Sequence, residues 1–381
     1  MKILIVTRES EADKKYGLGK SVKRIADELN ELGHETIYFS KTHCADAHEK
    51  WFSRLVTLLS PLGILAGAFA ERIIQGWSAS KEANHNQVTH VWFQDPWLVF
   101  GFNLRQKLTG RFKKKWVLGV SEHGLGSFTW AVTQDGISYS DFLYRWLLKY
   151  EKRVLLKSDW VWCPSNTALN LLLRDLQIIN CPKNWQAMPY GRPEPTVTHA
   201  DSPRMLQCKV PVIMAVGRVA PVKNYALLID ALSILEKKYN LYAKLVILGG
   251  GDSAKILDYA KSQGLTFMPE VKLVDNVFNE LSKAYLYTSA CNVESFGLAN
   301  REAVAFGLPC VVASGGASCE VLNEGAWLVP PKAALFAEAY RALLTDRHTL
   351  DFWQKNALNA SSQWASWKTV SKAYEQSLKS L

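Results

Sequence analysis

The sequence predicts an α/β protein of two domains, each built on a parallel β-sheet, with a cleft between them. In each half of the chain, short apolar runs alternate with amphipathic stretches, which is typical of parallel strands joined by crossover helices. A proline-rich segment separates the two series, and 381 residues are too many for one ordinary core. Because open α/β sheets bind ligands where their strands end, we expect a ligand in the cleft.

The first series of alternating segments starts directly after Met1. "KILIVT" (2–7) predicts a strand, and the amphipathic stretch 19–35 predicts a helix. Gly33 is a natural end for this helix, because glycine adopts left-handed backbone geometry at little cost. The further strands expected in this half are "TIYFS" (36–40), "THVWFQ" (89–94), "KWVLGVSE" (115–122) and "DWVWCPS" (159–165).

The second series follows residues 193–211, which contain four prolines and few large apolar side chains. This composition indicates an interdomain linker. The elements expected beyond it are strands at 212–217, 243–251, 285–292, 308–314 and 326–331, with helices at 224–240 and 252–263. We therefore expect Rossmann-like domains at 1–192 and 212–360, joined by the linker 193–211, and a helical segment at 361–381.

The composition indicates a globular protein, because 48% hydrophobic and 21% charged residues exclude large-scale disorder. The seven cysteines form no C-x-x-C pair, and no secretory signal pattern follows Met1. His43, Cys44 and His48 match no common zinc spacing. These features predict a reduced, cytoplasmic protein with free thiols and no metal site.

The net charge of +10 is concentrated in the first half of the chain. Residues 1–192 contain 26 Lys and Arg against 18 Asp and Glu, whereas residues 193–381 contain 19 against 17. A basic first half indicates an anionic partner, which could be nucleic acid, anionic lipid or a phosphorylated substrate.

The segment 51–77 is unusually apolar, and its residues 55–70 carry no charge. The run is short for a membrane span and is interrupted by Pro61. It is either a pair of helices buried against the sheet or folded over the cleft, or a helix lying on a membrane surface. Since the basic stretch 105–116 belongs to the same domain, we favour contact of both segments with an anionic membrane, on the inner face of the plasma membrane.

Two glycine-rich stretches resemble nucleotide loops but do not match them. In "GLGKS" (17–21), a Walker A loop would need glycine at position 14, where the chain has Lys14. In "GGGD" (249–252), the G-x-G-x-x-G spacing fails because position 254 is Ala. Neither stretch therefore supports a P-loop NTPase or a dinucleotide-binding dehydrogenase.

The second domain carries two cations at the end of its first strand. "VGRVAPVKN" (216–224) places Arg218 and Lys223 five positions apart, just before a helix. Two cations so placed can clamp a diphosphate, Arg218 through its planar fork and Lys223 as a point charge.

A pair of carboxylates follows in "ESFGLANREAVAFGLPCVVAS" (294–314). The backbone amides of Phe296, Gly297 and Leu298 lead into a helix, and free amides at a helix start suit a phosphate. Glu302, two turns further on, can accept hydrogen bonds from the vicinal hydroxyls of a ribose, and Glu294 can accept them from a sugar.

With Arg218, Lys223 and this E-x7-E pair, the sequence resembles the retaining, GT-B-fold glycosyltransferases of family 4, also called group 1. "GLGKSVKRIADELNELGHET", "SDWVWCPSN" and "GLPCVVASGGASCEVLNEGAWLVPP" are similar to conserved runs of that family, so the resemblance covers nearly the whole chain. "WASWKTVSKAYEQSL" looks like the helix that crosses back to the first domain in this fold. The resemblance implies a nucleotide-sugar donor and no metal or other cofactor.

The resemblance also implies roles for single residues. Arg218 and Lys223 would neutralise the donor diphosphate, and Glu302 would hold the ribose. Glu294, with the amides of residues 296–298, would position the donor sugar.

In the first domain, His123 of "VSEHGLGS" would face the transferred sugar, and Gly17 and Gly19 would offer backbone amides to the diphosphate. The chain departs from the family at "YGRPEP" (190–195), where a frequent aspartate is missing.

The function implied is retaining transfer of a sugar, by front-face attack, from a UDP-sugar (or, as second choice, a GDP-sugar) to an acceptor. A glycan or lipid-linked acceptor of surface polysaccharide or lipopolysaccharide synthesis fits the basic, apolar first domain. Two alternatives stay open: a related sugar-nucleotide epimerase, and a membrane-associated nucleotide-sugar-binding protein without turnover. A nucleic-acid partner is not expected, because it would not account for the carboxylate pair.

Overall fold

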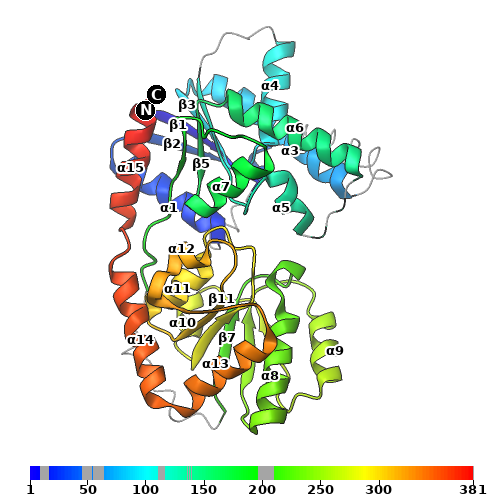
Figure 1. The fold of residues 1–381 in the computed structure, drawn as a ribbon. Helices are drawn as coiled ribbons and strands as arrows, with labels where there is room; N and C mark the ends of the chain where they lie inside the picture. Colours follow the sequence, from blue (N-terminus) through cyan, green and yellow to red (C-terminus); the bar gives the residue numbers. More distant parts are fainter. Residues whose placement is uncertain are drawn as a thin grey trace. The chain divides into compact units, whose positions relative to one another are not determined.

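Parallel β-sheets organise both halves of the chain (Figure 1). The computed structural model describes residues 1–8, 17–44, 54, 64–109, 116–134, 136, 138, 140–195 and 210–380. The chain divides into two units: unit 1 comprises Met1–Tyr190 and Ser366–Leu381, and unit 2 comprises Gly191–Ala365. The linker expected at 193–211 lies mostly outside the described residues, because 196–209 are not among them.

In the described part of unit 1, six parallel strands form a sheet of order β2-β1-β3-β4-β5-β6. The strands are β1 (Lys2–Val6), β2 (Glu35–Phe39), β3 (His90–Phe93), β4 (Val117–Ser121), β5 (Trp160–Cys163) and β6 (Trp185–Ala187). In β1, Ile3, Leu4, Ile5 and Val6 are all fully buried. A parallel sheet is covered on both faces, so its central strands are continuous apolar runs without alternation.

The helices of unit 1 each turn an apolar side towards this sheet or towards each other. They are α1 (Gly17–Glu31), α3 (Ile64–His85), α4 (Leu98–Leu108), α5 (Phe128–Gln134), α6 (Asp141–Lys157), α7 (Asn166–Asp175) and α15 (Trp367–Lys379). In α1 the buried side chains include Val22, Ile25, Ala26 and Leu29, which lie on one helical face. The chain leaves α1 through Gly33 at φ +85°, as the sequence predicts.

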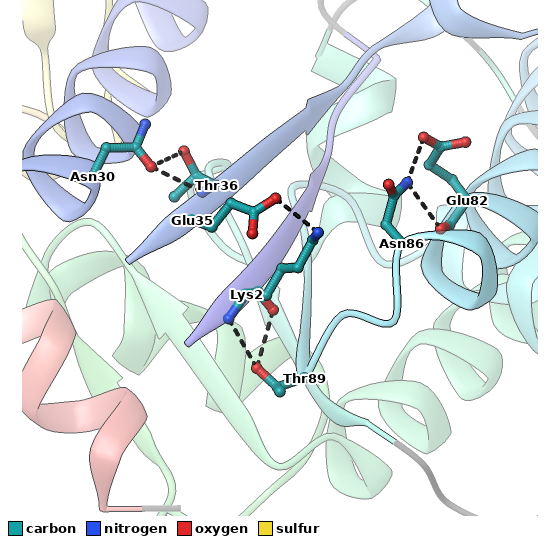
Figure 2. Close-up of polar contacts among 7 residues, drawn as sticks. All are labelled: Lys2, Asn30, Glu35, Thr36, Glu82, Asn86 and Thr89. Carbon is teal, nitrogen blue, oxygen red and sulfur yellow. Dashed lines mark hydrogen bonds and ion pairs between the residues drawn. The ribbon is translucent and has the colours of Figure 1, made fainter. Parts of the chain in front are cut away.

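Polar contacts fix the amino-terminal ends of the strands in unit 1 (Figure 2). The backbone N–H of Lys2 donates to Thr89 Oγ1 at 3.1 Å, and Lys2 Nζ pairs with Glu35 at 2.7 Å. Asn30 Oδ1 at the end of α1 accepts from the backbone N–H of Thr36 at 2.8 Å. These contacts tie β1 to the neighbouring strands on both sides, and so hold the parallel register.

The terminal helix α15 belongs to unit 1, as the resemblance implied. It packs against α1, and the two helices lie side by side in Figure 1. His34 Nε2 contacts Glu375 Oε1 at 2.7 Å, and Tyr374 donates to the backbone carbonyl of Met188 at 3.0 Å. Gly33 thus ends α1, and the next residue, His34, holds the terminal helix α15 through Glu375.

Unit 2 repeats this architecture, with six parallel strands among its described residues in the order β12-β11-β10-β7-β8-β9. They are β7 (Val212–Val216), β8 (Lys244–Leu248), β9 (Glu270–Lys272), β10 (Leu286–Ser289), β11 (Cys310–Ala313) and β12 (Trp327–Val329). The helices are α8 (Tyr225–Tyr239), α9 (Ala254–Gln263), α10 (Val277–Leu281), α11 (Leu298–Phe306), α12 (Ser318–Leu322), α13 (Ala333–Thr345) and α14 (Arg347–Ser362). The predicted two-sheet α/β fold is therefore confirmed.

Two strands, β6 and β9, are absent from the sequence prediction. Each has three residues and lies at one end of its sheet. In β9 (Glu270–Lys272) two of the three side chains are charged and all are half-buried. Such a short, polar edge strand lacks the apolar run by which the others were recognised.

The segments predicted to contact a membrane are described only in part, since 51–53, 55–63 and 110–115 lie outside the described residues. The described end of 51–77 begins α3, where Arg72 and Gln75 are buried. Trp116, at the end of 105–116, is also buried. Within the part of the chain that the structure covers, no helix has the length and apolar character needed to cross a bilayer.

Helices α3 and α4 cross at two glycines. A Cβ on Gly101 would overlap the carbonyl oxygen of Ile73, and one on Gly76 would overlap that of Leu98. We expect Gly101→Ala to destabilise unit 1 by about 3 kcal/mol, because the clash is with backbone that cannot rotate away. The loss would appear as a lower midpoint in urea unfolding.

Gly250→Ala is the matched control, because a Cβ there would meet only a methyl group of Leu273 at 3.8 Å. Equal unfolding midpoints for the Gly101 variant and the wild type would contradict this account of the helix crossing.

Candidate active site

The strand order of unit 2 reverses between β7 and β10. From β7 the sheet extends through β8 to β9, and β10 then lies on the other side of β7. At such a switch point the loops after the two strands diverge and leave a crevice for ligands. The loop after β7 carries Arg218 and Lys223, and the loop after β10 carries Glu294.

The loop after β7 is held in shape by close backbone packing. Gly217 has φ +149°, and the Tyr225 hydroxyl donates to its carbonyl at 2.7 Å. A Cβ on Gly249, at the end of β8, would overlap that same carbonyl. The backbone N–H of Val219 donates to the carbonyl of Gly250 at 2.8 Å. The "GGG" run, which resembles a dinucleotide loop in the sequence, thus holds the loop after β7 in place.

Lys223 and Glu294 form an ion pair across the switch point. Nζ of Lys223 lies 2.5 Å from Oε1 of Glu294, and the side chains are only 22% and 15% exposed. Lys223 ends a 3₁₀ turn, Pro221–Lys223, that precedes α8. The backbone carbonyl of Glu294 accepts from the backbone N–H of Ala317 at 2.8 Å, which fixes the backbone of the loop at Glu294.

This pair stays ionised over a wide pH range. Burial acts to raise the pKa of Glu294, but Lys223, with smaller contributions from the Cys291 thiol and the Gly297 backbone, holds that pKa below its usual value. Burial acts to lower the pKa of Lys223, and Glu294 outweighs it, so that pKa lies above its usual value. The stability contributed by the pair is therefore complete between the ordinary values of 4.5 and 10.5 and is lost outside them.

The amino-terminal end of α11 adjoins Glu294. Gly297 adopts φ +66° there, and a Cβ at that position would come within 2.9 Å of Asn300 Nδ2. Asn300 is itself held by the Tyr287 hydroxyl, which donates to Oδ1 at 2.7 Å. The first amides of a helix have no acceptor within the helix, so this end, from Leu298 onward, can receive an anion.

The remaining residues predicted for the second domain lie on the same two loops or on α11. Phe296 is buried beside Gly297, Glu302 is half-buried within α11, and the Arg218 side chain is exposed after β7. Arg218 and Glu302 each make a further interaction within the protein. The structure thus brings Lys223 and Glu294 into direct contact and places the others on adjoining backbone.

Arg301 is a residue of this site that the sequence reasoning missed. Its guanidinium lies 4.6 Å from the ring centroid of Phe296 and 3.9 Å from that of Trp364. The side chain is 5% exposed, burial lowers its pKa to about 10, and Nε has no hydrogen-bond partner among the described residues. The only signal in the sequence is a cation between Asn300 and Glu302 in the stretch after Gly297.

In unit 1, His123 follows β4 and both of its ring nitrogens are engaged. Nε2 lies 2.8 Å from Gln94 Oε1, and Nδ1 lies 2.7 Å from the Tyr190 hydroxyl. The amide oxygen can only accept, so Nε2 carries the proton and Nδ1 accepts from tyrosine. Burial lowers the pKa of His123 to about 3, so the ring is neutral at physiological pH and is no proton reservoir. Its predicted role facing the sugar stays a prediction.

A buried carboxyl cluster beside His123 also escaped the sequence reasoning. Glu122 is 1% exposed, and neither carboxyl oxygen has a partner among the described residues. Burial, then the nearby Glu151 and Asp95, raise its pKa well above the usual value. Burial also raises the pKa of Glu151 to about 7, although Phe128 and Thr129 donate to it. Burial therefore favours the protonated form of Glu122.

Gly17 and Gly19 stand in the first turn of α1. Gly17 has φ +42° and nothing lies within 4 Å of where its Cβ would be, so its backbone conformation is what requires glycine. The preceding residues 9–16, including Lys14, lie outside the described range. The diphosphate contact predicted for these two glycines stays a prediction.

Comparison with known proteins assigns the chain to a family. Residues 204–360 match the model for Glycosyl transferases group 1, and residues 16–182 match the model for Glycosyltransferase Family 4. Together the two models cover most of the chain. The fold, its switch-point site and these matches define a GT-B glycosyltransferase, and the chain belongs to group 1 of these proteins, as the resemblance predicted.

Individual relatives are more distant. An uncharacterized glycosyltransferase of Methanocaldococcus jannaschii is 31% identical over 170 residues, which span 42% of this chain and 43% of that protein, or less than half of its length.

Two solved structures show the same fold. A sucrose-phosphate synthase of Thermosynechococcus elongatus has a TM-score of 0.72 at 18% identity, covering 100% of this chain and 98% of its own. HepE of Anabaena has a TM-score of 0.72 at 15% identity, with 100% of both chains covered.

Lys223→Met is expected to reverse the pH dependence of stability in unit 2. In the wild type, the lowered pKa of Glu294 adds stability above about pH 4.5 that is lost on acidification. Without Lys223, burial raises this pKa, so the variant loses stability as the pH rises from about 5 to about 7. Urea unfolding midpoints at both pH values measure the difference.

The control is Glu294→Gln, which cannot titrate and should show neither dependence. If the midpoint of the Lys223→Met variant follows that of the wild type between the two pH values, the ion pair is not the electrostatic partner of Glu294.

Arg301→Met separates packing from charge. Methionine fills the gap between the two rings but removes a buried cation one turn into α11, where it adds to the positive potential at the helix start. We expect a thermal midpoint close to that of the wild type and a donor KM raised about fivefold, which corresponds to about 1 kcal/mol, with kcat little changed.

Arg301→Lys should restore most of the donor KM, because it keeps the charge. If the methionine and lysine variants share one KM, the charge of Arg301 has no part in donor binding.

Proposed function

We propose that this protein transfers a sugar from a nucleotide-diphosphate sugar to an acceptor hydroxyl, with retention at the anomeric carbon. The observation that carries the proposal is the Lys223–Glu294 pair at the switch point of the second sheet, beside the start of α11. A cation, a held carboxylate and free helix amides are the groups that a diphosphate and a sugar require.

UDP is the nucleotide we favour, with GDP second. HepE of Anabaena was solved in complex with UDP-glucose and in complex with UDP. The identities are low, so these complexes support the choice of donor class only.

The reaction needs the bond between sugar and phosphate to break while negative charge builds on the departing diphosphate. Arg218 and Lys223 lie on a backbone already fixed by Gly217 and Gly249, so they meet this charge without reorganising. Fixed cations and amides in a closed site lower a barrier more than the same groups do in water. In the proposed reaction these groups carry the charge without help from a metal.

The two carboxylates act as binding groups in this mechanism. Glu294 is held ionised by Lys223 and can only accept hydrogen bonds, which suits the hydroxyls of the donor sugar. Glu302, on α11, is placed for the ribose. The acceptor attacks on the face that the diphosphate leaves, its oxygen bonds to the anomeric carbon, and its proton passes to the departing phosphate.

The acceptor we propose is a glycan or lipid-linked intermediate of surface polysaccharide or lipopolysaccharide synthesis, handled in the cytoplasm at an anionic membrane. The basic surplus of residues 1–192 supports this choice. An epimerase would release a free sugar or nucleotide sugar without any acceptor, and a non-catalytic protein would bind the donor without turnover.

Lys223→Ala tests the diphosphate clamp. We expect donor turnover, measured as nucleotide release with a panel of nucleotide sugars, to fall by about a hundredfold or more, the size of effect found for one lost charge-stabilising donor. Lys244→Ala is a control. Lys244 pairs with Glu270 at 2.7 Å, where β8 and β9 begin, at the edge of the sheet opposite to the one that carries Lys223. If the Lys223 variant turns over the donor as fast as the wild type, Lys223 does not clamp the diphosphate.

Glu302→Ala tests the ribose contact. Titration calorimetry with the preferred nucleotide sugar should show affinity lowered about tenfold, because the lost contact is a charge-assisted hydrogen bond. Undiminished affinity would refute the assignment. Glu338→Ala, on α13 of the same unit, serves as the control.

A further inference from the structure

One face of helix α6 (Asp141–Lys157) combines exposed aromatic side chains with cations. Its members are Phe142, Arg145, Trp146, Lys149, Lys152, Arg153, Leu156 and Lys157. At 3.6 residues per turn these positions share a sector of about 140°. We propose that this face, the α6 surface, binds the anionic surface of a lipid bilayer.

The apolar members of the α6 surface are exposed to solvent. Phe142 is 80% exposed, Trp146 43% and Leu156 49%. Single exposed apolar residues are ordinary, but three on one helical face are a patch that favours a partner. A bilayer interface accepts aromatic rings at the level of the lipid headgroups.

The charged members have one sign. Arg145, Lys149, Arg153 and Lys157 make no ion pair among the described residues, and Lys152 donates to the backbone carbonyls of Leu176 and Gln177. The one acid on the exposed side is Asp141, at the first position of the helix. A lysine or arginine near an anionic bilayer contributes about 1 kcal/mol. This charge complementarity selects an anionic lipid surface as the occupant.

The opposite face of α6 anchors the helix in unit 1. Leu147, Val154 and Leu155 are buried, and buried Glu151 accepts from the first amides of α5. Ser140 caps the helix by accepting from the backbone N–H of Leu143. The α6 surface is therefore already helical and oriented, so binding need not include the cost of folding it.

Trp146 joins the α6 surface to the start of α3, which lies beside α6 in Figure 1. Its ring contacts Phe69 edge-on at 6.3 Å and stacks on Tyr150 at 6.1 Å. Phe69 ends the charge-free run 55–70. The inference thus deepens the membrane contact within the proposed function, because it adds α6 to the segments 51–77 and 105–116 that the sequence predicts to contact the membrane.

Vesicle sedimentation tests the proposal with the full chain and without donor or acceptor. We expect the wild type to sediment with phosphatidylcholine vesicles containing about a third phosphatidylglycerol at low salt, and to be released at about 1 M salt, where the Debye length is about 3 Å. Pure phosphatidylcholine should retain far less. Absence of the wild type from the anionic pellet at low salt would overturn the proposal.

Two double variants assign the binding to α6. Phe142→Ser with Trp146→Ser removes both aromatic rings and should weaken partitioning at least tenfold. Lys149→Glu with Arg153→Glu should weaken it at least about 25-fold, fivefold for each cation lost. Lys149 and Arg153 are exposed, so the thermal midpoint of that variant should match that of the wild type. Because Trp146 packs on Phe69 and Tyr150, the Phe142/Trp146 variant is checked instead for a wild-type circular-dichroism spectrum at the assay temperature. Partitioning like the wild type in both variants would overturn the proposal.

Matched controls come from unit 2. Phe352→Ser changes a ring that is 56% exposed on α14, and Lys255→Glu with Lys261→Glu on α9 makes the same change in net charge. Both controls should bind vesicles like the wild type. An equal loss in the α9 control would mean that net charge alone governs binding, and a dimer that dissociates in the Phe142/Trp146 variant would mean that the surface faces a second copy. Either result would overturn the proposal.

These outcomes are independent of catalysis, because the vesicles carry no sugar acceptor. Vesicle binding by a protein without transferase activity would leave the α6 assignment intact and remove the proposed function, whereas the opposite result would do the reverse.

Discussion

The ion pair between Lys223 and Glu294 is the contact on which the proposed site depends. It joins side chains 71 positions apart, and it can form because the parallel sheet reverses its strand order between β7 and β10. A lone carboxylate at 15% exposure would have a raised pKa and would draw a proton. Paired with Lys223, the Glu294 carboxylate stays charged and fixed in position. The backbone between Glu294 and the start of α11 is then held in one conformation.

Both sheets have six parallel strands, but their strand orders differ, and they offer different chemistry where their strands end. In unit 2 the edge presents the cation Lys223, which is held beside the carboxylate of Glu294. In unit 1 the same edge buries Glu122 and Glu151 beside a neutral His123. Burial raises the pKa of both carboxyls, which favours their neutral forms. That difference agrees with placing the diphosphate on unit 2.

The structure shows where part of the excess positive charge of the first half lies, namely on the exposed face of α6. Counting residues shows the surplus, but it does not separate cations in ion pairs from those on a free face. Arg72 is buried and paired with Asp95, whereas the cations of the α6 surface share one side with exposed aromatic rings. The apolar segment 51–77 drew attention in the sequence, yet its described part turns inward.

The sequence by itself determined the α/β class, most of the strands and the stop of α1 at Gly33, because each depends on a local pattern. It also predicts Arg218, Lys223, Glu294 and Glu302 as site residues from a fixed spacing, and their roles stay predictions. Periodicity reports which face of an element is apolar, and glycine reports where the backbone must turn. Only the tertiary structure decided that Lys223 meets Glu294, that Arg301 lies between Phe296 and Trp364, and that α6 keeps an exposed face. These facts depend on strand order and packing between distant segments, and no local pattern records which distant side chain fills a given space.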